Sequence, residues 1–159
     1  MNAPGSSARR PFVGPCPVLY DGNDVRNAWA HARRDLVLTQ PPSVEVHGWW
    51  HDRAEAVVAA LRRELPHTAI ARGPGLDPIA RAWRQHRDGD RAVADVVDLA
   101  RAADRAGLDA LVLDPEAAWK GRNPTERAAL SSIAAEAVET IARELPALPL
   151  YVTTYASPV

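Results

Sequence analysis

The chain is poor in the features that mark several common classes of protein. It has a single cysteine, Cys16, so it cannot form an internal disulfide, which is typical of a reducing compartment. Its 19 basic and 20 acidic side chains leave a net charge of −1, which argues against nucleic acid or an anionic membrane as the main partner. No apolar run approaches the roughly 18 residues of a membrane-spanning helix.

Recognisable cofactor and metal motifs are also missing. Gly73-Pro74-Gly75 lacks the spacing and the following lysine of a phosphate loop, and no Gly-x-Ser-x-Gly elbow occurs. His47 and His51 flank a Gly-Trp-Trp segment, but no third ligand accompanies them. We therefore expect no cofactor and no metal.

The N-terminal residues differ in composition from the rest of the chain. Residues 1–16 are rich in Pro, Gly, Ser and Ala and are predicted to be a flexible lead-in, with residues 17–159 forming one domain. No apolar stretch follows Arg9 and Arg10, so the segment does not resemble a secretory signal. A cytoplasmic location is the expectation.

Short apolar runs alternate with longer segments of helical periodicity. The runs predict five strands, at residues 18–20, 36–39, 68–71, 110–113 and 150–154, with a short extended piece at residues 44–46. The helical segments lie between them, at residues 24–34, 51–65, 78–87, 91–106 and 124–145.

Capping residues and charge patterns refine these helices. Asn123 followed by proline and Glu126 predicts a helix start, and Gly107 predicts a helix end. In the helix of residues 51–65, the arginines Arg62 and Arg63 are expected to face water.

Alternation of this kind predicts an α/β fold with parallel strands joined by right-handed crossovers. An open doubly wound sheet and the first part of a (β/α)8 barrel both fit, and such a barrel normally needs about 250 residues. The predicted class is therefore barrel-like but incomplete, with about five strands. A second copy of the chain could then cover the open edge expected after Val159, which predicts a homodimer.

Either architecture binds ligands at the carboxyl ends of its strands. The residues expected there are Asp21, Gln40, Arg72, Asp114, Glu116 and Tyr155. Asp114 and Glu116 are two residues apart and point to the same side if the strand continues through them. Such a carboxylate pair can perform acid–base chemistry. The alternative is that Asp114 and its proline open a turn, with Glu116 in solvent.

The sequence around these acids resembles a known signature. Asp109-Ala-Leu-Val-Leu-Asp114-Pro-Glu116 is similar to the fourth-strand motif Asp-x-x-Asp-x-Asp-x-Glu of family 18 chitinases. Three acids match, whereas Val112 replaces the middle acid and Pro115 stands where an aromatic residue is usual.

The chain also resembles the family 25 lysozymes. Those enzymes carry an acid after strand one, matched by Asp21, and Asp-x-Glu after strand four, matched by Asp114 and Glu116. Their fifth strand often reads like residues 149–153. Both families are (β/α)8-barrel glycoside hydrolases that act on N-acetylated glycans.

The resemblance implies a function for each acid. Glu116 would be the general acid, Asp114 would orient an N-acetyl group acting as internal nucleophile, and Asp21 would support the site electrostatically. The substrate would be peptidoglycan or a chitin-like glycan. Val112 and the missing strands six to eight favour a second hypothesis, a non-catalytic carbohydrate-binding or assembly domain derived from such a barrel. A flavodoxin-like ligand-binding domain is a third hypothesis, disfavoured by the lack of a phosphate loop.

Aromatic residues lie near the same predicted rim. Trp49, Trp50 and Trp119 fall in loops after strands two and four, and Tyr155 follows strand five. Aromatic rings stack on sugar rings, so these side chains are candidate substrate-binding residues; packing within the loops is the alternative.

Overall fold

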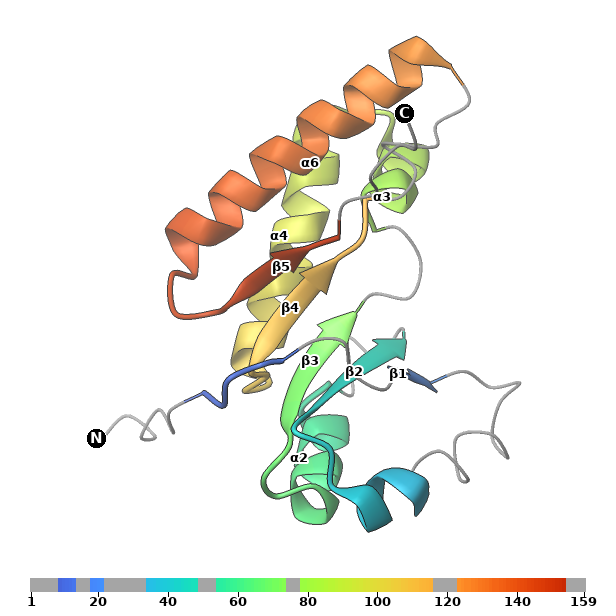
Figure 1. Ribbon diagram of the computed structural model, residues 1–159. Coiled ribbons are helices and arrows are strands. Elements are labelled where there is room, and N and C mark those ends of the chain that lie inside the picture. The colour runs from blue at the N-terminus through green and yellow to red at the C-terminus, as the bar shows by residue number, and fades with distance from the viewer. Residues whose placement is uncertain are drawn as a thin grey trace.

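A computed structural model describes residues 9–13, 18–21, 34–48, 54–73, 78–115 and 123–153. The five strands form one sheet in the order β1-β2-β3-β4-β5, and each neighbouring pair is parallel (Figure 1). The strands are β1 (Val18–Asp21), β2 (Ser43–Gly48), β3 (Ala69–Gly73), β4 (Ala110–Leu113) and β5 (Leu150–Val152).

The labelled helices pack on one face of this sheet. They are α2 (Ala54–Glu64), α3 (Pro78–His86), α4 (Gly89–Arg105) and α6 (Pro124–Glu144). A single apolar core joins them to alternate strand residues, among them Val44, Val46, Ile70, Leu111 and Leu113. We call this side of the sheet the helix face.

The strand order distinguishes the two architectures that the sequence allows. A doubly wound sheet reverses its strand order and carries helices on both faces. Here the order is sequential and the helices of the described chain share one core on one face. The barrel-like α/β class is therefore confirmed.

The second strand was predicted in the wrong place. Residues 34–39 are helical, and the strand is Ser43–Gly48. A central parallel strand is buried on both faces, whereas Leu38 is 73% exposed and only Leu36 of its run is buried. The helical turn closes when the Gln40 N–H donates to Leu36 O at 2.8 Å.

The predicted helix ends agree better with the structure. The Asn123 side chain accepts from the Glu126 N–H at 2.8 Å and caps α6 as expected. Gly107 has φ +73°, the left-handed conformation that favours glycine after a helix. Helix α4 begins earlier than predicted because Asp88 caps it by accepting from the Arg91 N–H.

The opposite side of the sheet, which we call the inner face, carries small side chains. Ala71, Ala110 and Val112 form a separate buried cluster there, and Phe12 packs against it. The Phe12 ring also lies 5.2 Å from the ring of Tyr151 on β5. In a closed barrel, side chains from the strands fill this interior. In the described chain, Phe12 occupies part of that volume.

Polar contacts hold the segment that carries Phe12. We call residues 9–13 the N-terminal strap; Figure 1 shows it crossing the sheet near the beginnings of β3 and β4. Arg9 donates to Leu108 O and pairs with Asp104. At the other end of the strap, the Val13 N–H donates to Ser43 Oγ at 2.8 Å. The strap therefore joins the beginnings of β2 and β4.

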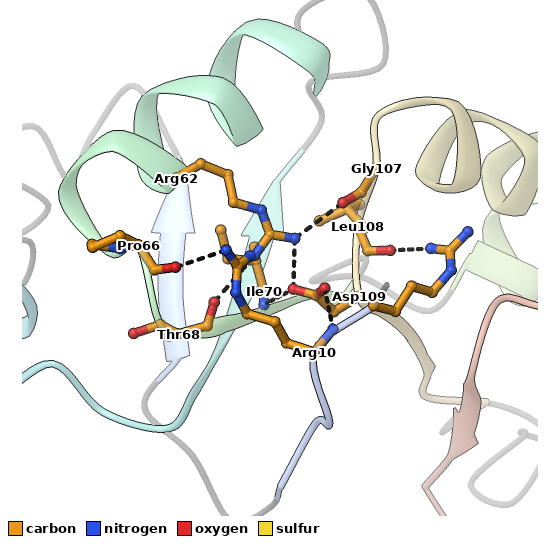
Figure 2. Close-up of polar contacts among 9 residues, drawn as sticks. Arg10, Arg62, Pro66, Thr68, Ile70, Gly107, Leu108 and Asp109 are labelled. Carbon is orange, nitrogen blue, oxygen red and sulfur yellow. Dashed lines mark hydrogen bonds and ion pairs between the residues drawn. The ribbon is translucent and has the colours of Figure 1, made fainter. Parts of the chain in front are cut away.

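A buried carboxylate organises the amino ends of the strands (Figure 2). Asp109 is 2% exposed and stands just before β4. Its Oδ1 accepts from the Arg10 N–H at 2.8 Å, and its Oδ2 accepts from the Ile70 N–H at 2.8 Å and from Arg62 at 2.6 Å. One side chain thus links the strap, β3 and α2 to the start of β4.

Arg62 does not simply face water, so that prediction was wrong. Its side chain is 21% exposed and its guanidinium reaches the amino ends of the strands. Besides pairing with Asp109, it donates to Thr68 O at 3.2 Å and to Gly107 O at 3.1 Å. The long arginine side chain lets a partly exposed residue of α2 reach a buried acid.

Replacing Asp109 should test this network. Asp109→Ala removes the acid that pairs with Arg62 and the acceptor of two backbone N–H groups, so the free energy of unfolding should fall by about 3 kcal/mol. Urea unfolding followed by circular dichroism measures it. Asp98→Ala is the control, because Asp98 is 69% exposed and should change stability by less than about 1 kcal/mol. Equal effects of the two substitutions would contradict the role given to Asp109.

Phe12 offers a second test. Phe12→Ala removes the ring that covers the inner face and should lower the free energy of unfolding by about 2 kcal/mol, because the ring is only partly buried. Its neighbour Val13 is 52% exposed, so Val13→Ala should cost within about 0.5 kcal/mol. Limited proteolysis should also cut the strap faster in Phe12→Ala; unchanged cleavage would argue against a docked strap.

Candidate active site

Because all strands are parallel, their carboxyl ends meet at one edge of the sheet, which we call the carboxyl edge. Asp21 ends β1 opposite Gly48, the last residue of β2. Gly73 ends β3, Asp114 follows β4 and Thr153 follows β5. Both described acids of the predicted catalytic set therefore come from this edge.

Asp114 belongs to the inner face of the sheet. It is two residues beyond Val112 and four beyond Ala110, and both of these lie in the inner-face cluster. The Asp114 side chain is half-buried, and the Thr153 hydroxyl donates to its Oδ1 at 2.7 Å. The carboxylate is thus held by a side chain of the neighbouring strand end.

Sequence reasoning placed Thr153 in the predicted fifth strand but gave it no functional role. Its contact with Asp114 depends on the register of β4 against β5, in which Leu113 lies opposite Val152. That register places the residues after both strands side by side on the inner face. The apolar run at residues 150–154 predicts a strand that contains Thr153. No local pattern in the sequence predicts that its side chain contacts Asp114.

Asp21 and Asp114 stand on strands that are not neighbours. Strands β1 and β4 are separated by β2 and β3, so their backbones are about 14 Å apart along the sheet. The two carboxyl groups of a glycosidase usually lie roughly 5–10 Å apart. The backbone spacing therefore argues against Asp21 and Asp114 as a closely spaced carboxylate pair.

The other predicted site residues lie outside the described residues. They are Glu116, Trp49, Trp50, Trp119 and Tyr155. In the sequence, each follows the end of a strand of this sheet: β2, β4 or β5.

Gln40 was expected at the carboxyl edge, and that prediction was wrong. It follows helical residues rather than a strand and precedes β2. Its side-chain amide donates to Val37 O at 3.0 Å and to Glu64 O at 2.9 Å. Gln40 thus links the ends of two helices and lies before the start of β2, whereas Asp114 lies after the end of β4.

Arg72 does lie near the carboxyl edge, but its side chain belongs to the helix face. It stands between Val46 and Leu111 in the strand register, and it is fully buried. Burial lowers the pKa of Arg72 to about 10, so the guanidinium stays charged at neutral pH.

A cavity of about 570 Å³ lies elsewhere, between α3 and α4 in the helix layer. Its described lining includes Arg81, Gln85, Asp95, Leu99 and Arg105, and it includes none of the predicted site residues. The cavity therefore adds nothing to the carboxyl edge. The described residues contain no group of three or more His, Cys, Asp or Glu that could hold a metal ion.

No helix in the described part of the chain is both long and apolar enough to cross a membrane. Comparison of the chain with protein-family models, with curated proteins and with solved structures gives no match in any of the three. The carboxyl edge, with Asp114 held by Thr153, is therefore the feature from which a function has to be argued.

Asp114→Asn separates a functional from a structural role of this residue. An asparagine can still accept the Thr153 hydroxyl proton through its Oδ1, so the free energy of unfolding should change by less than about 1 kcal/mol. Thermal and urea unfolding measure this directly. A loss as large as that expected for Asp109→Ala would indicate that the carboxylate of Asp114 is mainly structural.

Proposed function

We propose that the chain is a glycoside hydrolase-like domain that acts on N-acetylated glycans such as peptidoglycan or chitin. The observation that carries the proposal is the half-buried Asp114, on the inner face at the carboxyl end of β4, with its Oδ1 bonded to Thr153. A barrel-like sheet uses this edge for chemistry. Glu116, two residues further along the chain, supplies the second acid of the proposed site.

Cleavage of a glycosidic bond needs a proton for the leaving oxygen and stabilisation of positive charge at the anomeric carbon. We assign the proton to Glu116. The acetamido oxygen of the substrate attacks the anomeric carbon as the bond to the leaving oxygen breaks. Asp114 accepts a hydrogen bond from the acetamido N–H and balances the positive charge that develops on that group. Water then attacks the anomeric carbon, the bond from that carbon to the acetamido oxygen breaks, and the Glu116 carboxylate takes up the proton that the water releases.

The remaining predicted residues have supporting roles in this proposal. Asp21 contributes negative charge from the end of β1, at a distance that suits stabilisation of a cationic transition state rather than proton transfer. Trp49, Trp50, Trp119 and Tyr155 are proposed to stack on sugar rings. Their places in the sequence, after β2, β4 and β5, support this assignment.

A non-catalytic carbohydrate-binding or assembly domain is the second candidate, and one observation favours it. Val112, at the position of the middle acid in the chitinase-like motif, is 6% exposed in the apolar cluster beneath Phe12. No acid from position 112 can therefore assist Asp114. Tyr151 and Val152 of β5 are exposed, and a homodimer formed through this strand is part of the same alternative.

Release of reducing sugar from peptidoglycan and from chitin oligomers tests the proposal. The wild type should release it, and Glu116→Gln should lower the rate at least about 100-fold because the general acid is lost. Asp114→Asn should lower it similarly. Glu136→Gln is the matched control, since Glu136 is an exposed residue of α6, and it should keep full activity.

The outcomes separate the two candidates. Full activity in Glu116→Gln would exclude it as the general acid. If the wild type is retained on insoluble peptidoglycan or chitin without releasing product, the binding domain is favoured; light scattering then tests the homodimer.

A further inference from the structure

We infer that Thr153 is a positioning residue that fixes the rotation of the Asp114 carboxylate. The inference rests on the proposed function and adds to it a role for Thr153, to which neither resemblance assigns one. It starts from a single contact, the 2.7 Å hydrogen bond between Thr153 Oγ1 and Asp114 Oδ1.

The proton of the Thr153 hydroxyl has two acceptors within reach. Asp114 Oδ1 lies at 2.7 Å, and Leu113 O lies at 3.3 Å. Leu113 O already accepts the Thr153 backbone N–H at 2.9 Å. A hydroxyl has one proton, and short O–H···O⁻ bonds are the stronger kind. The proton therefore goes to the carboxylate.

Thr153 is itself held firmly enough to act as a reference point. Its backbone N–H continues the parallel hydrogen-bond pattern of β4 and β5, directly after the pair Leu113 and Val152. A β-branched side chain has few rotamers, so the hydroxyl position follows from the strand. An aspartate carboxylate, by contrast, turns easily about its last torsion.

The bond turns Oδ1 toward β5, where it accepts from Thr153. Because the two oxygens of a carboxylate lie in one plane, this contact sets the plane of the group that is proposed to accept the acetamido N–H of the substrate. Small errors in the orientation of such a group lower the rate of the chemical step more than they weaken substrate binding.

A purely structural role makes a different prediction. If Thr153 only joins the ends of β4 and β5, its loss lowers stability and leaves the chemical step unchanged. Thr153 is exposed, and an exposed hydrogen bond contributes little to stability. Turnover number, KM and melting temperature together distinguish the two roles.

The experiment compares Thr153→Val with Thr153→Ser, using a chitin oligomer as substrate. Valine keeps the shape and strand preference of threonine but has no hydroxyl, so kcat should fall about 10-fold while KM changes less than about 2-fold. Serine keeps the hydroxyl and should restore most of kcat. Thr39→Val is the control, because its hydroxyl bonds to Asp35 O at 2.8 Å before β2, away from the carboxyl edge.

Two results would overturn the inference alone: an active wild type whose kcat is unaffected by Thr153→Val, or a Thr153→Ser variant as slow as Thr153→Val. A lower melting temperature with unchanged kcat would assign Thr153 the structural role. An inactive wild type would instead overturn the proposed function, and the inference with it, so the two failures are distinguishable.

Discussion

The arrangement of this protein depends on one buried negative charge. A carboxylate that is almost excluded from water needs hydrogen-bond donors. Asp109 accepts hydrogen bonds from the strap, from β3 and from α2. Those donors come from segments far apart in the chain. The requirement to satisfy Asp109 therefore sets how the strap, α2 and the beginnings of two strands meet. The same residue fits a motif that otherwise belongs to catalysis, yet it lies at the end of β4 opposite to Asp114 and has a structural task.

The two ends of the sheet thus have different characters. At the amino ends of the strands, polar groups form hydrogen bonds with one another, as in the contacts of Arg62 and of the strap. At the carboxyl edge, a half-buried acid lies on the inner face and is oriented by a neighbouring hydroxyl. The apolar cluster beneath Phe12 lies between the two ends on the same face. The cluster also explains why an apolar residue suits position 112, where the chitinase-like motif has an acid.

Much of the fold could be predicted from local patterns, because burial on both faces gives β4 its continuous apolar run and amphipathic spacing marks α4 and α6. The second strand could not be predicted in this way. Residues 36–39 are as apolar as a strand, and only the packing of Val44 and Val46 against the helices decides between the two segments. Asp114 was predicted from its motif and lies where a strand end should place it. Thr153 and Arg62 were missed as partners of acids, because register and long-range reach are properties of the assembled sheet rather than of any short segment.

The strap has a consequence for the order in which the protein folds. Its bonds to Asp109 and to the region of β5 close loops of 99 and 139 residues, which are among the slowest contacts for a chain of this length to form. These two contacts can form only after the segments that contain Asp109 and Tyr151 have been made. During synthesis the strap therefore emerges well before the strands that it contacts, and the inner face stays without this cover until those strands have been made.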